Sequence, residues 1–480
     1  MHLFIFLLFI NIFKLLTARY FPLIGDEAFY WVWGQHLAFS YTAHPPMIAY
    51  VNFLLTALLG HNYLAIRFGA IAAVLLISWL IYLTGKELYD KRAGATAAVI
   101  FNLLPTFFGG GMFLVPQTVL FLFWTWSFYL LVRLVRTGRG HYWYWLGLSA
   151  GLGLLSDHIM GLFFLATIAY CLLRSEQRSW FTRKEPYLAA LLSFLIFFPS
   201  LLWDLSHGLA PLLYWGGKMG AGAGPRIGDN LLNFFGLQLL LYTPPLFCLT
   251  CYLIFRRFWK PETERLGFQK QGNREVHSPV SLFSIFSAVV FLPFLLISPL
   301  VMVGGHWPAT AYLPAIIGSG KTKKWIIGTI IVFALLVNSL AFVYYIFLYP
   351  TPPDLKGKEF TVNQQFAAFI KQATPARGRT FYLADDIGTF GLVTFHGRVK
   401  VYPPPKQLKE AEAWGTADIK PGDNVIYFTR ENTLEIQAGL KKVFQAVAVE
   451  KTKRLFTKDA DIPTKMTIFH CRSYLGGRIP

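Results

Sequence analysis

The chain has 480 residues, of which 55% are hydrophobic and only 14% are charged. This composition excludes a string of ordinary soluble domains, because soluble proteins carry about 25% charged residues. The formal net charge of +19 does not by itself indicate nucleic-acid binding, because the basic residues fall between apolar segments. We therefore expect a polytopic membrane protein without a nucleic-acid partner.

Eleven apolar runs come close to the ~17 to 25 residues that a helix needs to cross a bilayer. They lie at residues 2–18, 62–84, 93–108, 113–132, 142–157, 158–173, 187–203, 230–255, 280–300, 306–320 and 325–348. The first run lacks the basic leader and cleavage site of a secretory signal peptide, so we expect a retained span. These runs predict an all-α polytopic membrane region of about eleven spans, or up to thirteen.

The basic residues between the predicted spans are unevenly distributed. Nineteen Lys and Arg fall in one set of loops, at 85–92, 133–141, 174–184, 256–279 and 321–324. The alternate segments, at 19–61, 109–112, 204–229 and 301–305, hold only Arg19, Lys218 and Arg226. Because cytoplasmic loops are enriched in Lys and Arg, we expect a cytoplasmic N-terminus and an extracytoplasmic C-terminal domain. In a bacterium this predicts the inner membrane and the periplasm.

The tail differs in composition from the rest of the chain. We expect residues 1–349 to form the membrane region and residues 350–480 a water-soluble domain. Short β-rich runs at 380–383, 399–402, 424–428, 444–449 and 466–470 alternate with helical patterns at 361–372, 405–414 and 432–443. This alternation predicts a small α/β domain. Asp385 and Asp386 are expected to cap a helix that contains Phe390.

The first predicted outer loop, at 19–61, carries the most informative residues. From 25 to 50 it reads GDEAFYWVWGQHLAFSYTAHPPMIAY, with Asp26 and Glu27 ahead of an aromatic cluster that includes Tyr30. Trp and Tyr concentrate at membrane interfaces, so we expect both carboxylates at the headgroup boundary. A partly desolvated acid there can accept a proton from an incoming nucleophile. The other interpretation is that both acids only stabilise the first turn of an interfacial helix.

This loop resembles a known family. Its acidic pair, its aromatic cluster and His44-Pro45-Pro46 are similar in spacing to the first loop of the protein O-mannosyltransferase and aminoarabinose transferase (ArnT-like) superfamily, the GT-C glycosyltransferases. Weaker similarities follow in order along the chain: Trp203-Asp204-x-x-His207, Gln238 with Thr243-Pro244, and His306-Trp307-Pro308-Ala309.

The resemblance implies the GT-C fold and an inverting enzyme that takes a sugar from a polyprenyl-phosphate carrier. The sugar passes to an acceptor outside the cytoplasm, which is lipid A, another glycan or a protein. The resemblance also implies that Asp26 is the catalytic base or acceptor-orienting residue and that Glu27 is its partner. A bacterial member would use undecaprenyl phosphate. A lipid-linked donor needs no nucleotide, which fits a chain without a Gly-rich phosphate loop beside a strand.

The departing lipid phosphate must be stabilised by cations. Arg67, near the outer end of the second predicted span, is a candidate because arginine inside an apolar run is costly. The alternative is that its side chain extends to the nearby interface. Lys218 and Arg226 lie in the Gly-rich stretch 216–228, which would suit a lid over bound substrate. The alternative is that both are solvated loop charges.

Tyr30 and four further residues are candidates for binding substrate. His44 either contacts substrate or hydrogen-bonds within a rigid turn before two prolines. His207 and His306, at outer span ends, either line the same cavity or serve the structure. Asp157 either binds substrate or hydrogen-bonds within a helical hairpin. A divalent metal bound by these side chains and the loop carboxylates stays undecided, because no ligand spacing such as H-x-x-x-H identifies a site.

Two positions depart from the family's pattern. Asp157-His158 stands where the family commonly has Lys-Tyr, and Val115-Pro116-Gln117 stands where it commonly has Thr-Pro-Asp. These changes indicate either a different donor or acceptor, or a member that has lost activity. Two other functions therefore stay open: a transporter or flippase for a lipid-linked sugar, and a non-catalytic protein that binds one. If the chain is a transporter, we expect broken helices at mid-membrane depth.

Overall fold

The structure is a computed structural model of the chain. It describes residues 2–18, 23–220, 227–259, 268–271, 274–277, 280–344, 379–397, 399–403, 418–429, 433–454, 465–477 and 479. The chain divides into two compact units. The first comprises Met1–Leu15, Ala43–Met47 and Ala70–Leu348, and the second comprises Leu16–Thr42, Ile48–Gly69 and Tyr349–Pro480.

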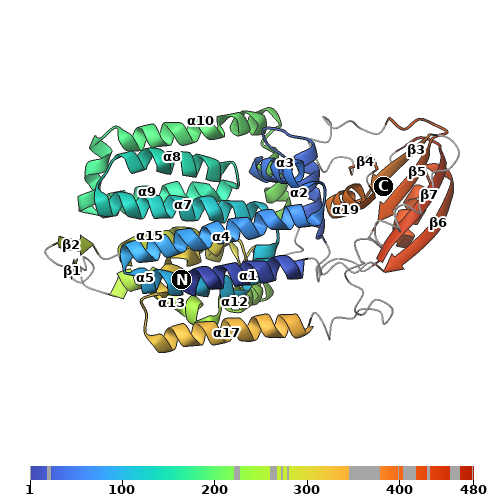
Figure 1. The fold of residues 1–480 in the computed structure, drawn as a ribbon. Helices are drawn as coiled ribbons and strands as arrows, with labels where there is room; N and C mark the ends of the chain where they lie inside the picture. Colours follow the sequence, from blue (N-terminus) through green and yellow to red (C-terminus); the bar gives the residue numbers. More distant parts are fainter. Residues whose placement is uncertain are drawn as a thin grey trace. The chain divides into compact units, whose positions relative to one another are not determined.

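The first unit is built almost entirely of helices (Figure 1). They are α1 (His2–Ala18), most of α4 (Tyr63–Leu88), α5 (Lys91–Leu103), α6 (Pro105–Phe108), α7 (Pro116–Thr137), α8 (His141–Leu154), α9 (Gly161–Leu173), α10 (Glu185–Ser206), α11 (Ala210–Gly220), α12 (Ile227–Tyr242), α13 (Pro244–Trp259), α15 (Val280–Ile297), α16 (Leu313–Ser319) and α17 (Lys324–Val343). Helix α8 packs against both α7 and α10. An antiparallel hairpin, β1 (Phe268–Gln271) and β2 (Arg274–His277), lies in the predicted loop 256–279, where we expected no strand.

Each of the eleven predicted spans contains a helix, so the predicted helical membrane region is confirmed. Within the described residues, five helices are long and apolar enough to cross a membrane: α4, α7, α10, α15 and α17. Counting each of three sharply bent helix pairs as one span raises this number to eight. The total of eleven spans stays a prediction.

The predicted span at 230–255 is not one straight helix. Helix α12 ends at Tyr242, α13 begins at Pro244, and the two helices are bent by 110°. Pro244 has no N–H to donate and restricts the residue before it. That residue, Thr243, has a positive φ of 67°, so the chain turns sharply instead of continuing the helix. A 75° bend in front of Pro105 similarly separates α5 from α6.

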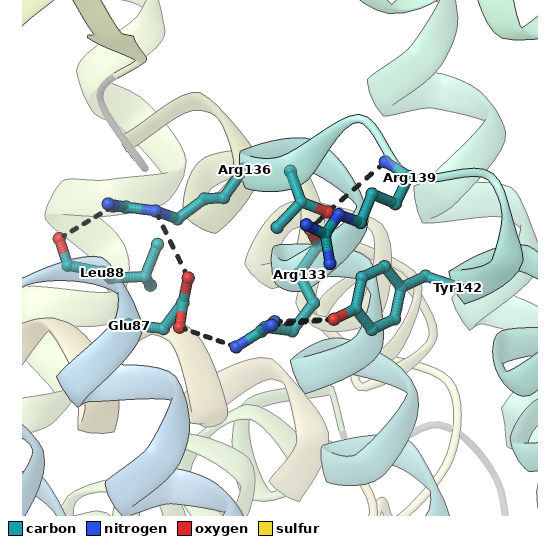
Figure 2. A network of polar contacts seen from close by, with 7 residues as sticks. Glu87, Leu88, Arg133, Arg136, Arg139 and Tyr142 are labelled. Atoms are coloured by element: carbon teal, nitrogen blue, oxygen red, sulfur yellow. Dashed lines mark hydrogen bonds and ion pairs between the residues drawn. The ribbon is translucent and has the colours of Figure 1, made fainter. Parts of the chain in front are cut away.

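Basic residues near the end of α7 tie the ends of three helices together (Figure 2). The Glu87 carboxylate at the end of α4 lies 3.1 Å from Arg133 Nη1 and 3.8 Å from Arg136 Nε, both on α7. Arg133 also donates to the hydroxyl of Tyr142 on α8, at 2.8 Å from Nη2. These side chains are about a quarter exposed, so each pair contributes only about 0–1 kcal/mol. The network fixes the loops that carry two of the predicted cytoplasmic clusters of basic residues.

The second unit combines two loop helices with the tail. The loop helices are α2 (Gly25–Gln35) and α3 (Met47–Leu59). The tail has strands β3 (Thr380–Ala384), β4 (Val401–Tyr402), β5 (Asn424–Thr429), β6 (Phe444–Arg454) and β7 (Lys465–Tyr474), with helices α19 (Ile387–Gly397) and α21 (Thr433–Leu440). All five predicted strands are present, in the order β4-β3-β5-β7-β6. The expected small α/β domain is confirmed, while the predicted helices at 361–372 and 405–414 lie outside the described residues.

Strand β3 pairs in parallel with β4 and β5, whereas β7 pairs antiparallel with β5 and β6. A parallel connection needs a crossover, and α19 supplies it between β3 and β4. Asp386 begins this helix as predicted, since its Oδ1 accepts a hydrogen bond of 2.9 Å from the Thr389 N–H. The sequence prediction of a capped helix around Phe390 is therefore confirmed.

Helix α19 of the tail packs closely against α2 of the first loop. A Cβ atom added to Gly391 would lie 2.5 Å from the backbone nitrogen of Phe29, and one added to Gly25 would lie 3.0 Å from Cα of Gly388. Only glycine permits such approach of two backbones. The tail helix therefore holds the helix that carries Asp26 and Glu27.

We expect Gly391→Ala to lower the free energy of unfolding by roughly 1–3 kcal/mol, because the new methyl group overpacks a backbone contact. Gly328→Ala on α17 is the matched control, because a Cβ there meets nothing within 4 Å. The control should be neutral or slightly stabilising. Thermal unfolding of both purified variants checks this contact, and equal midpoints would contradict it.

His396 near the end of α19 makes stability depend on pH. Burial lowers its pKa to about 4, whereas an unfolded histidine titrates near 6.5. Below about pH 6.5 the unfolded chain binds a proton that the folded ring does not, so stability is full above that pH and falls toward pH 4. We expect a loss of at most about 1.4 kcal/mol per pH unit. His396→Gln should remove this part of the slope in unfolding measured at pH 7.5 and 5.5.

Candidate functional site

The two neighbouring acids of α2 have different environments. Glu27 is fully buried, and its Oε2 lies 2.8 Å from Nη2 of Arg67, which is also fully buried. The same oxygen accepts a hydrogen bond of 3.3 Å from the N–H of Ile24, the residue that precedes α2. Arg67 lies in the first turns of α4, so this ion pair joins α2 to α4. Glu27 thus stabilises the start of its helix, as one of our two interpretations expected.

Asp26 is exposed in the first turn of α2. Among the residues that the structure describes, no hydrogen bond or ion pair to its carboxylate is found. Its negative charge at the helix N-terminus is favourable. An accessible carboxylate on a rigidly held helix can accept a proton from a nucleophile that approaches it.

The aromatic residues of the first loop form a compact cluster. Tyr30 is 8% exposed, and its ring centre lies 5.2 Å from that of Trp33. Trp33 in turn stacks on Tyr41, with ring centres 4.3 Å apart and an angle of 11° between the planes. The Tyr41 hydroxyl donates to the carbonyl oxygen of His36 at 2.9 Å and accepts from the Ala38 N–H at 3.0 Å. These contacts fix the chain that follows α2.

In the first unit, His44 and Asp157 are brought together. His44 Nδ1 lies 3.4 Å from Asp157 Oδ2, and the two side chains are 5% and 8% exposed. The Gln117 amide nitrogen lies 3.4 Å from the same oxygen, and the Ile159 N–H donates to Oδ1 at 2.9 Å. The two departures from the family's pattern, at 117 and 157, are therefore in contact with each other. The rings of Trp215 and His44 meet edge to face, with their centres 5.3 Å apart.

Three of the other predicted binding residues lie elsewhere in the first unit. His207 follows α10 and is held by a neighbour on that helix. Its ring stacks on that of Trp203, with the ring centres 3.9 Å apart, and its Nδ1 lies 2.8 Å from the Trp203 carbonyl oxygen. His306 is exposed in a turn before α16. Lys218 lies within α11, so part of the predicted Gly-rich loop is helical. Arg226 lies outside the described residues. The binding roles of all four residues stay predictions.

Lys14 is a buried cation whose role the sequence analysis missed. It lies in α1, is 1% exposed, and donates from Nζ to the carbonyl oxygen of Phe107 at 2.8 Å. A cation near the end of a helix stabilises its free carbonyl groups, so Lys14 holds the short helix α6 after the bend at Pro105. A lysine within an apolar run is itself a signal for such a role.

No group of three or more His, Cys, Asp or Glu side chains is placed to hold a metal ion within the described part of the chain. The metal requirement therefore stays undecided.

Comparisons with known proteins agree with this architecture. A family model described as Dolichyl-phosphate-mannose-protein mannosyltransferase matches residues 43–203. Among solved structures, the chain is similar to ArnT from Cupriavidus metallidurans bound to undecaprenyl phosphate, with a TM-score of 0.66, 12% identity and 99% of both chains covered. The chain has the GT-C fold. The apo structure of that ArnT gives a TM-score of 0.64 at 12% identity over 97% of both chains.

No curated protein matches the sequence. The GT-C fold that the resemblance of the first loop implied is nevertheless confirmed. The chain has the apolar helices of an integral membrane protein and a small C-terminal sheet domain.

Proposed function

We propose that the chain is an inverting glycosyltransferase that moves a sugar from a polyprenyl-phosphate carrier to an acceptor outside the cytoplasm. The observation that carries the proposal is the division of roles on α2, where Glu27 is locked to Arg67 and Asp26 is exposed. The match to the mannosyltransferase family model and the fold shared with an ArnT that binds undecaprenyl phosphate support this reaction class.

In this mechanism Asp26 accepts the proton of the acceptor hydroxyl. The hydroxyl oxygen attacks the anomeric carbon of the sugar while the bond from that carbon to the phosphate oxygen breaks. The electron pair leaves with the phosphate, and attack from the opposite side inverts the anomeric centre. Glu27 and Arg67 hold α2 in place. A phosphate contact for Arg67 would require its buried guanidinium to leave Glu27. We therefore assign Arg67 a positioning role.

The acceptor in this proposal is lipid A, another glycan or a protein. The excess of Lys and Arg in alternate loops supports a cytoplasmic N-terminus and a periplasmic tail in a bacterial inner membrane. The first loop is then on the periplasmic side, where the acceptor approaches.

A transporter for the same lipid-linked sugar is the second candidate. The bent pairs α5 with α6 and α12 with α13 favour it, because broken helices mark substrate pathways in transporters. Proteoliposomes that contain a labelled polyprenyl-phosphate sugar and an acceptor extract separate the two functions. The enzyme releases free polyprenyl phosphate in proportion to labelled acceptor. Movement of intact donor between leaflets without release would support the transporter.

A further inference from the structure

Two carboxylates and two imidazoles form a cluster at the junction of α8 and α9. Asp157 pairs with His44, as described, and the next residue, His158, places Nε2 3.5 Å from Oδ2 of Asp204 on α10. Because residues 157 and 158 are adjacent, the two pairs form one group, which we call the Asp157–Asp204 cluster. Its members come from three separate segments of the first unit.

One oxygen of this cluster lacks a donor. Asp204 is 4% exposed, and its Oδ1 has no hydrogen-bond partner among the described residues. Asp157 differs, because both of its oxygens are engaged. A buried acceptor without a partner is costly, and native proteins usually satisfy such groups. The His158 side chain is 41% exposed, so one end of the cluster lies at the surface, whereas Asp204 Oδ1 itself is buried.

The chemistry of the cluster selects its ligand. Ionised carboxylates only accept hydrogen bonds, so Asp204 Oδ1 requires an O–H or N–H donor. While their partner imidazoles are neutral, the two buried carboxylates also oppose the approach of a further anion, because like charges repel strongly where water is excluded. Phosphate and carboxylate groups are therefore poor ligands here, and hydroxyl and amino groups are good ones.

We propose that the Asp157–Asp204 cluster is a subsite that recognises hydroxyl or amino groups of the transferred sugar and rejects an acidic sugar. This inference rests on the proposed function. Asp204 contacts the sugar through Oδ1. Asp157, held by Gln117 and the Ile159 N–H, is a positioning residue that orients His44. The departures at 117 and 157 then mark a change in sugar recognition rather than a loss of the site.

The test compares three polyprenyl-phosphate donors, which carry a neutral hexose, an amino sugar and a uronic acid, with the full-length protein in nanodiscs. We expect kcat/KM for the uronic acid to be at least ~10-fold lower than for the best donor. Asp204→Asn should raise KM for that donor by roughly 10- to 100-fold with a smaller change in kcat, since a hydrogen bond to a charged group is lost. The same substitution should also reduce the difference in kcat/KM between the best donor and the uronic acid donor. Glu185→Gln, at the other end of α10, is the matched control.

A preference for the hexose or for the amino sugar identifies whether a hydroxyl or an amino group is bound, and either supports the subsite. The inference is overturned if the uronic acid is used as well as the others, or if folded Asp204→Asn leaves every KM unchanged. Should that variant not fold, His158→Gln, at the exposed side of the cluster, makes the same comparison. Absence of transfer from all three donors would instead overturn the proposed function, and the inference with it.

Discussion

Asp26→Asn is expected to lower kcat for sugar transfer by ~10²- to 10⁴-fold, the usual contribution of a general base. The amide has nearly the same size and shape as the carboxylate but cannot accept the proton of the acceptor hydroxyl. Because Asp26 is exposed in the first turn of α2, the substitution should leave the fold and the KM for the donor almost unchanged. Initial rates of transfer from a labelled donor measure both constants.

The matched control is Asp229→Asn. Asp229 is also exposed in the first turn of a helix, α12, so the same loss of charge is made at a position without a proposed catalytic role. We expect its kcat to stay within about twofold of the native value. A folded Asp26→Asn variant that transfers sugar as fast as this control would remove Asp26 from the mechanism.

Glu27→Gln and Arg67→Met should each lower the free energy of unfolding by ~3–5 kcal/mol, because each leaves an uncompensated charge or polar group in a fully buried pair. The double variant Glu27→Met with Arg67→Met should be more stable than either single charge removal, since neither charge then remains buried. Denaturant or thermal unfolding of the purified variants measures these differences.

Lys321→Met provides the comparison for the buried pair. Lys321 Nζ lies 2.8 Å from Asp90 Oδ2, the same separation as in the Glu27–Arg67 pair, but the two side chains are 58% and 44% exposed. An exposed pair contributes only about 0–1 kcal/mol. Equal losses at the two sites would show that burial of Glu27 and Arg67 does not determine the effect.

Much of the architecture could be predicted because it depends on local sequence. Apolar runs, aromatic residues at the interface and the alternation of strands and helices in the tail each depend on residues near one another. The break at Thr243 and Pro244 was missed because apolar composition continues across it, although the proline was a signal for a break. Helix α3 was missed because its thirteen residues are too few to cross a bilayer.

The site was harder to predict because its contacts join distant parts of the sequence. Asp26 and Glu27 are adjacent and chemically alike, and the buried one, Glu27, pairs with Arg67, which lies forty residues later. The contact between Gln117 and Asp157 is also a product of folding, since the two residues lie on different helical segments. Asp204 was noted only as part of a weak motif, and its unpaired oxygen is visible only in three dimensions.

The central claim, transfer of a sugar from a polyprenyl-phosphate carrier, is tested most directly with purified native protein, one labelled donor and native membrane acceptors. The account predicts that label moves from the donor to an acceptor with release of one polyprenyl phosphate per sugar transferred, and that the anomeric configuration is inverted. Tight binding of every donor tested, with no label in any acceptor and no polyprenyl phosphate released, would contradict it.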